Sequence, residues 1–332
     1  MIISASYKTD IPTFYGEWFI NRLRAGYCKM VNPYGGQIYR VNLLQEEVDG
    51  FVFWTKNVGP FLSHLTEIHR RGYPFVIQHT INGYPRELES RVIDYARTVE
   101  HMKRLSGDYG ADRLIWRYDP IIFSSLTPLD WHRSNFVSLA RALAGTTDEV
   151  VVSFAQLYKK TEHNMDAAAQ KFGFTWDEHK KEAFILQQGR LLIEELAQIA
   201  ASYGMQLKIC SQRAFLISGV VEEAHCVDAD RLERVAGQAF KEKQQQRGNR
   251  KECGCFASKD IGEYDTCPHG CVYCYAVHSR SVALARHKAH DPLSDFLFPP
   301  TRYTAEEISR GRVIHVVTEH KDKSVNSQNS EL

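Results

Sequence analysis

Three cysteines with short, unequal spacing stand towards the end of this 332-residue chain. Cys267, Cys271 and Cys274 share one loop, Cys-Pro-His-Gly-Cys-Val-Tyr-Cys, with three residues between the first two and two between the second pair. Thiolates are soft ligands that suit iron–sulfur clusters and zinc. Three thiolates at this spacing can wrap one face of a cubane cluster. One iron would then lack a protein ligand, and an open coordination position is where chemistry occurs.

The other cysteines suggest a second site. Of the eight in the chain, five fall between Cys253 and Cys274. In a reducing compartment, clustered cysteines indicate metal or redox chemistry rather than disulfides. Cys253 and Cys255 form a Cys-Gly-Cys unit, and with Cys210 and Cys226 they predict a second site that holds either a further [4Fe–4S] cluster or zinc. The alternative is that Cys210 and Cys226 are small core residues.

The Cys-x-x-x-Cys-x-x-Cys loop, with an aromatic before its last cysteine, resembles the signature of radical S-adenosylmethionine enzymes. In that superfamily the three cysteines hold a [4Fe–4S] cluster whose unique iron binds the methionine part of S-adenosylmethionine, and reductive cleavage yields a 5′-deoxyadenosyl radical. The resemblance implies that Cys267, Cys271 and Cys274 are the ligands and that Tyr273 packs near the adenine. It also implies a (β/α) barrel and an electron donor such as ferredoxin or flavodoxin. The wording of the motif is nearest to spore photoproduct lyase-like members, whose substrate is damaged DNA.

Nearly the whole chain is also similar to an uncharacterised, mainly bacterial family that carries this motif at its C-terminus. The core of that similarity comprises Gln246-Arg247 to Cys253-Gly254-Cys255, Asp260-Ile261-Gly262, and Cys267 to Ala276. In the superfamily the cysteine loop follows the first barrel strand, whereas here it follows the last predicted strand by more than fifty residues. We therefore expect a permuted arrangement that brings the loop to the same rim. The chain lacks the Gly-Gly-Glu-like stretch that usually binds the methionine amino group.

Short apolar runs alternate with helical stretches over the first two-thirds of the chain. The predicted strands are Ile2–Ala5, Gly50–Trp54, Phe75–Ile77, Leu114–Trp116, Val150–Phe154 and Gln206–Ile209. The predicted helices are Thr13–Arg24, Phe61–Arg71, Arg86–Leu105, Leu129–Leu143, Glu182–Tyr203, Asp228–Phe240 and Val277–His287. Unbroken apolar strands are typical of a parallel sheet covered on both faces. The alternation predicts an α/β fold, a partial (β/α) barrel of about six parallel strands followed by a C-terminal cysteine-rich cluster-binding segment.

Polar residues follow each predicted strand, where barrels and open α/β sheets carry their functional rim. Lys56, Arg117 and Asp119 are candidate catalytic residues, and Arg117, Ser153 and Gln156 are candidate cofactor contacts. A guanidinium such as that of Arg117 can grip a carboxylate or a phosphate in bidentate fashion. The alternative is that these residues only cap strands and begin loops.

The organisation follows from these elements. We predict a barrel-like domain over residues 1–212, a cysteine-rich iron–sulfur segment over 213–300 packed on the barrel rim, and a disordered tail over 321–332. A formal net charge of +1 argues against strong non-specific binding to nucleic acid, which needs many phosphate contacts. No apolar run has the length of a membrane span, and the N-terminal residues lack the pattern of a signal peptide. The expected location is the cytoplasm.

Two functions from different classes fit these features. The first is a radical S-adenosylmethionine-type enzyme with a permuted cluster motif, acting on an unknown substrate held at the strand ends. The second is a non-radical iron–sulfur or zinc protein in electron transfer or in ligand or nucleic-acid binding. Iron and sulfide content separates cluster from zinc, and cleavage of the cofactor separates enzyme from carrier.

Overall fold

The structure is a computed structural model that describes residues 1–32, 36–177, 180–248, 250, 252–300 and 315–316. The strands are β1 (Ile2–Ala5), β2 (Tyr27–Val31), β3 (Ile38–Asn42), β4 (Gly50–Thr55), β5 (Phe75–Thr80), β6 (Leu114–Ile121), β7 (Glu149–Phe154), β8 (Gln206–Ile209), β9 (Glu222–Glu223), β10 (Lys259–Asp260) and β11 (His315–Val316). The helices are α1 (Ile11–Phe14), α2 (Gly16–Ala25), α3 (Leu62–Arg70), α4 (Tyr95–Tyr109), α5 (Leu129–Leu143), α6 (Lys159–Phe172), α7 (Glu182–Ser202), α8 (Ala229–Ala236) and α9 (Arg280–Lys288). The tail predicted for 321–332 lies outside the described residues.

A parallel sheet of eight strands organises the chain, in the order β10-β1-β4-β5-β6-β7-β8-β9. Every neighbouring pair is parallel. The six predicted strands are its six inner members, which confirms the α/β class and the parallel sheet. Two-residue strands extend it at each edge, because β10 pairs with β1 and β9 with β8. Within the described residues β9 and β10 do not pair, so the sheet is not closed into a barrel.

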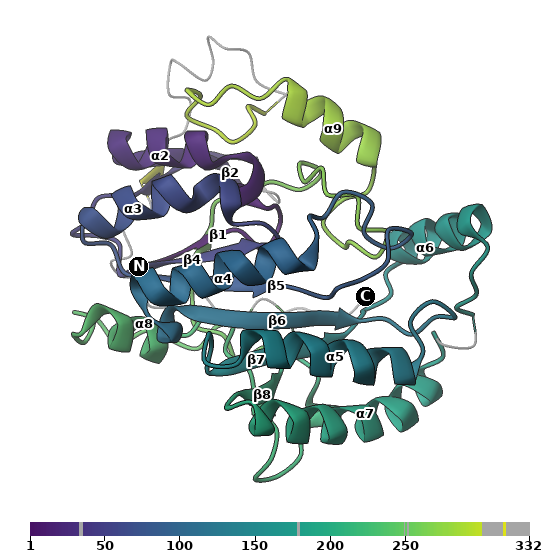
Figure 1. The fold of residues 1–332 in the computed structure, drawn as a ribbon. Coiled ribbons are helices and arrows are strands. Elements are labelled where there is room, and N and C mark those ends of the chain that lie inside the picture. Colours follow the sequence, from purple (N-terminus) through teal and green to yellow (C-terminus); the bar gives the residue numbers. More distant parts are fainter. Residues whose placement is uncertain (33–35, 178–179, 249, 251, 301–314, 317–332) are drawn as a thin grey trace, which may run out of the picture.

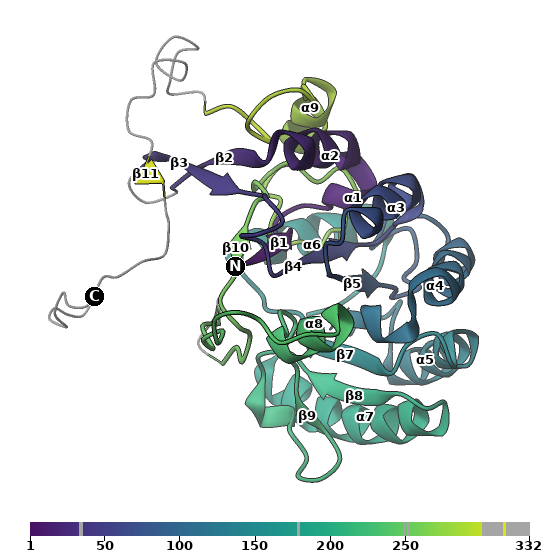
Figure 2. The ribbon, with the colours of Figure 1, turned by 90° about the vertical axis from the view of Figure 1, so that its left-hand side faces the viewer.

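Strict alternation of side chains divides each strand between two buried faces. On one face, Phe53, Ile77 and Trp116 join the main core, against which helices α3, α4, α5 and α7 pack (Figure 1). On the other, Val52 and Ile115 join a second apolar cluster that includes residues of α8. Figure 2 shows α8 on the side of the sheet opposite these helices. Coverage of both faces explains why the strands are unbroken apolar runs.

The structure corrects several predicted elements. The predicted helix Thr13–Arg24 is divided at Tyr15 into α1 and α2. The predicted helix Arg86–Leu105 is wrong in its first part, because α4 begins at Tyr95, where the carboxylate of Asp94 caps the helix by accepting from the Ala96 N–H. The β2–β3 hairpin and helix α6 were not predicted.

The predicted domain boundary near residue 212 stays a prediction. β9 and β10 both follow that residue and join the same sheet as the strands before it. Across the described part of the chain, no helix combines the length and apolarity that a membrane crossing requires.

Candidate functional site

Strand β10 carries the cysteine loop to the carboxyl ends of the parallel strands. The carboxylate of Asp260 accepts hydrogen bonds from Ser4 Oγ at 2.8 Å and from Ser6 Oγ at 2.7 Å. Gly262 approaches β1 so closely that a Cβ there would fall 2.0 Å from Ser6 Oγ, so only glycine fits. Because β10 runs parallel to β1, the loop that follows it emerges at the same rim as the segment that follows β1.

The segment between β5 and α4 holds the loop from its other side. Glu89 forms an isolated antiparallel bridge with Cys271, and the Val272 N–H donates to the Leu88 carbonyl at 3.1 Å. Gly270 adopts a left-handed φ of 72° between the first two cysteines. A side chain at this position would be strained, so the glycine in the motif serves the tight turn.

The three thiols of the loop are free, half-buried and close enough to influence one another. Burial raises the pKa of each thiol, and the charges of Asp10, Cys274 and Cys271 raise that of Cys267 further. The ammonium of Lys56 acts in the opposite direction and lowers the pKa of both Cys271 and Cys274. The Lys56 ammonium therefore lies near Cys271 and Cys274.

Backbone N–H groups point at these sulfurs. Cys267 accepts from the N–H of His269, and Cys274 accepts from those of Ala276 and Val277, the former at 3.4 Å. Hydrogen bonds to cysteine sulfur stabilise the thiolate form and tune the potential of a bound cluster. The donor set thus fits an iron–sulfur cluster.

No group of three or more His, Cys, Asp or Glu side chains, among those the structure describes, converges tightly enough to hold a single metal ion. The ligands of a cubane cluster attach to separate iron corners, so they stand farther apart than ligands that share one ion.

A buried polar network adjoins Cys271. Lys56, which follows β4, pairs with the carboxylate of Glu89 at 2.8 Å. Glu89 also accepts from the hydroxyl of Tyr273 and from Asn82 Nδ2. Burial lowers the pKa of Lys56, but the carboxylate of Glu89 outweighs it, so the net shift is upward. Lys56 is therefore a charged ammonium beside the cysteine loop.

His269, inside the motif, contacts Asp10, the N-cap residue of α1. Its Nε2 lies 2.8 Å from Asp10 Oδ2 in a fully buried pair. Asp10 also accepts from the backbone N–H groups of Thr13 and Lys56. Burial alone would raise the pKa of Asp10. The hydrogen bond from His269, together with those from the N–H groups of Lys56 and Thr13, outweighs burial, so the pKa of Asp10 lies below its ordinary value. Asp10 thereby fixes the cysteine loop to α1 and to the end of β4.

A second polar group lies on the face of the sheet that α8 covers. The guanidinium of Arg117 donates to Asp119, to Gln78 Oε1 at 3.2 Å and to Cys226 Sγ at 2.9 Å. The hydroxyl of Ser153 donates to Asp119. Burial raises the pKa of Asp119, but Arg117 lowers it more, so the carboxyl is ionised at neutral pH. The predicted residues on β6 and β7 are therefore in direct contact.

The remaining predicted residues are placed differently. Gln156 is exposed, and its Oε1 accepts from Tyr158 and from Arg250. Cys210 and Cys226 are in sulfur contact at 3.4 Å, and Cys253 and Cys255 lie beside them.

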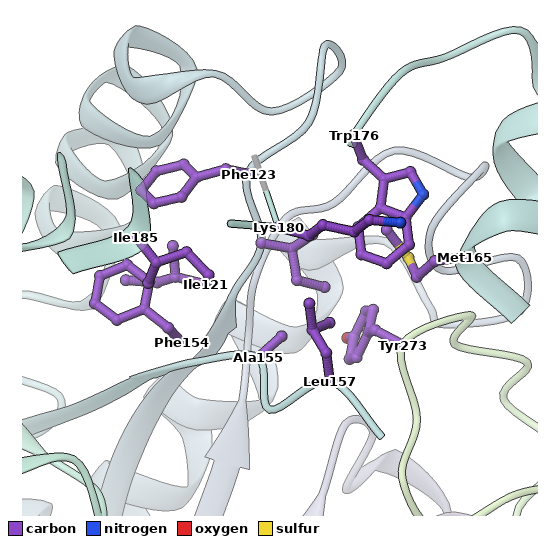
Figure 3. Close-up of a pocket in the computed structure, with 11 residues that line it drawn as sticks. Ile121, Phe123, Phe154, Ala155, Leu157, Met165, Trp176, Lys180, Ile185 and Tyr273 are labelled. Carbon is purple, nitrogen blue, oxygen red and sulfur yellow. The ribbon is translucent and has the colours of Figure 1, made fainter. Parts of the chain in front are cut away.

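An apolar pocket opens beside the cysteine loop (Figure 3). It is open to solvent, has a cavity volume of only about 20 Å³, and is lined mainly by apolar side chains from β6, β7, α6 and the segment after α6. Tyr273 forms one wall, and Figure 3 shows its ring pointing into the pocket from the cysteine-rich segment. The ammonium of Lys180 lies over the Trp176 ring at 4.8 Å and is the charged group of the lining. Tyr273 thus belongs both to the Glu89 network and to the pocket.

The sequence analysis missed Glu89, Asn82 and Asp10. Glu89 lay inside the wrongly predicted helix Arg86–Leu105 and so was not among the residues that follow a predicted strand. Asp10 was visible among the polar residues that follow β1, but its partner His269 is 259 positions away in the chain. Only the pairing of β10 with β1 brings the two together.

Comparison with family models gives one match over most of the chain. The model described as "Domain of unknown function (DUF1848)" matches residues 2–276. The chain belongs to this family. The match includes β10 and all seven cysteines of the two candidate sites, so both lie within the DUF1848 domain. Searches of curated proteins and of solved structures found no match.

Proposed function

We propose that this DUF1848 protein is an iron–sulfur enzyme of the radical S-adenosylmethionine type. The observation that carries the proposal is the position of the cysteine loop. In the superfamily that the motif resembles, this loop follows the first strand of the barrel. Here the loop follows β10, which comes late in the chain but lies next to β1 at the edge of the sheet. Spatially, β10 takes the place of a first strand, as a circular permutation would produce.

The surroundings of the loop support a cluster held by Cys267, Cys271 and Cys274. Three thiols, N–H donors to two of the sulfurs and the facing Lys56 ammonium are what an anionic cluster with one open iron requires. A reduced cluster would supply the electron that cleaves S-adenosylmethionine, and its open iron would hold the methionine end of the cofactor.

The residues of the chain have separable roles in this proposal. Lys56 offsets the negative charge of the cluster, and the carboxylate of Glu89 positions the Lys56 ammonium through their ion pair. Tyr273 forms the wall between the loop and the apolar pocket, so a substrate would lie next to the cofactor there once the pocket had widened to admit it. Arg117, held by Asp119, and Ser153 line the same rim and are proposed cofactor contacts, whereas the exposed Gln156 is proposed at the outer margin. Substrates with an apolar or aromatic part suit the lining of the pocket.

The test is reductive cleavage of the cofactor. Anaerobically reconstituted protein, given dithionite and S-adenosylmethionine, should release 5′-deoxyadenosine and methionine. A Cys267→Ala, Cys271→Ala, Cys274→Ala variant should lose this activity at least a hundredfold, because no cluster would remain to transfer the electron. Cys28→Ala is the matched control, since Cys28 is a buried free thiol of β2 outside both cysteine sets. Wild-type protein that carries a full cluster and yields no 5′-deoxyadenosine would contradict the proposal.

Two observations favour a second candidate, an iron–sulfur protein that only transfers electrons. The Gly-Gly-Glu-like stretch is missing from the sequence, and the ions at the rim already pair with one another, as Lys56 does with Glu89 and Arg117 with Asp119. Reversible reduction of the cluster without cofactor cleavage in the same assay would support it.

A further inference from the structure

We infer that Cys210, Cys226, Cys253 and Cys255 form a four-thiolate site for a thiophilic metal, either a zinc ion or an iron–sulfur cluster. Soft, tetrahedral sulfur donors are the chemistry that both groups require. This site is separate from the three-cysteine loop, and it does not depend on radical chemistry there.

The four sulfurs form a continuous series of contacts. Cys226 Sγ lies 3.4 Å from Cys210 Sγ, Cys226 contacts Cys255, and Cys255 contacts Cys253. All four are free thiols, and none is more than half-exposed. Tetrahedral zinc holds its sulfurs about 2.3 Å from the metal, which spaces them somewhat under 4 Å apart. The Cys226–Cys210 contact is slightly shorter than that spacing, and no three of the four described thiols already surround a point that could hold an ion. Binding would therefore require side-chain rotations that draw all four sulfurs around the metal.

Three separate segments must converge to bring these thiols together. Cys210 directly follows β8, and Cys226 follows β9. Cys253 and Cys255 belong to a segment, residues 250 and 252–257, that is called the strap below. The strap packs on the face of the sheet that α8 also covers, and its Phe256 N–H donates to the Val227 carbonyl at 3.0 Å. Free cysteines packed only as small core residues have no reason to gather from three segments, whereas metal ligands do.

Gly254 allows the strap to approach. A Cβ at this position would lie 3.0 Å from Glu223 and 3.0 Å from His225. A side chain at this position would require the Glu223 and His225 side chains to shift by a few tenths of an ångström. The Cys-Gly-Cys spacing is thus matched to the space that the segment after β9 leaves.

Charge compensation is built into the surroundings. Four thiolates around a divalent ion or a [4Fe–4S]²⁺ cluster leave a net charge of about −2. The guanidinium of Arg117 donates to Cys226 Sγ at 2.9 Å, and Gln78 Nε2 donates to the Cys226 carbonyl at 2.8 Å. Arg250 comes from the strap beside these cysteines and stacks over the Tyr275 ring at 5.3 Å. Cations and donors beside the sulfurs are how proteins stabilise such anionic centres.

Metal analysis by variant tests the inference without any activity assay. In the Cys267→Ala, Cys271→Ala, Cys274→Ala background, anaerobically purified protein should retain either about one zinc or about four irons with four sulfides per chain. Adding Cys253→Ser and Cys255→Ser should remove at least four-fifths of that metal, whereas adding Cys28→Ser should leave it unchanged. Metal content that the serine substitutions do not alter would overturn the inference. Zinc alone identifies an ion, and iron with equal sulfide identifies a cluster.

Thiol protection in the wild-type protein tests the same site without variants that might misfold. Cys210, Cys226, Cys253 and Cys255 should alkylate at least tenfold faster, and together, after zinc and iron chelators are added. Cys28 is the internal reference and should keep its rate. The inference fails if the four thiols react at the same rate with and without chelator, or if Cys210 and Cys226 are recovered as a disulfide. Peptide mass spectrometry identifies which cysteine is alkylated. Loss of metal from the three-cysteine loop is therefore distinguished from loss of metal from the four-cysteine site.

Discussion

Lys56 and Glu89 form a buried ion pair beside the three-cysteine loop. The side chain of Glu89 is 3% exposed and that of Lys56 is 13% exposed, so neither charge can turn to water if its partner is removed. Removing one member of such a pair costs several kcal/mol, because the other is left buried without compensation. The pair therefore serves as a positioning device for the loop as well as a charge beside its sulfurs.

A double-mutant cycle tests this coupling. Lys56→Met and Glu89→Gln should each lower the free energy of unfolding by about 3 kcal/mol. The double variant should be less destabilised than the sum of the two by about 1–3 kcal/mol, because both charges are then absent. Urea unfolding of the anaerobic protein measures all four corners of the cycle. Additive single effects would show that the two side chains are not coupled.

At the scale of elements, the sheet was largely predictable and the segments that cross it were not. Strands such as Val150–Phe154 are buried on both faces, so they are short apolar runs that few other structures produce. The β2–β3 hairpin escaped prediction because the prediction rests on unbroken apolar runs, whereas β2 alternates buried and half-buried residues. The residues around Glu89 have a helix-like charge pattern, but Glu89 instead forms a β-bridge with Cys271. The segment between β5 and α4 thereby holds the cysteine loop and is called the clamp below.

Helix α8 covers the face of the sheet opposite α3, α4, α5 and α7, and Arg231 fixes it there. Its guanidinium pairs with Asp148 at 2.9 Å and with Glu149 at 3.0 Å, and the side chains of Arg231 and Glu149 are each 5% exposed. Lys208 also contacts Glu149 at 2.8 Å, so the carboxylate keeps one cation when Arg231 is removed.

Arg231→Met should lower the free energy of unfolding by about 3 kcal/mol, at the low end for a broken buried pair. The matched control is Arg104→Met on α4, where the ion pair with Asp108 is exposed and should contribute nothing measurable. Chemical denaturation of both variants against wild type makes the comparison. Equal effects of the two substitutions would mean that α8 is not held by this ion pair.

For the whole molecule, the candidate sites depend on contacts between residues far apart in the chain. The motif Cys267-x-x-x-Cys271-x-x-Cys274 is local, so the sequence alone was enough to single it out. Its partners are not local, because Asp10, Lys56 and Glu89 reach it only through the pairing of β10 with β1 and the clamp before α4. The late position of the loop in the chain likewise gains its meaning only from the order of strands in the sheet.

The central claim is that Cys267, Cys271 and Cys274 hold a [4Fe–4S] cluster, and the most direct measurement is iron and acid-labile sulfide in protein purified without oxygen. The account predicts that the triple alanine variant contains about four irons and four sulfides per chain fewer than wild type. Cys28→Ala should match wild type. Equal iron and sulfide in the wild-type protein and the triple variant would contradict the account.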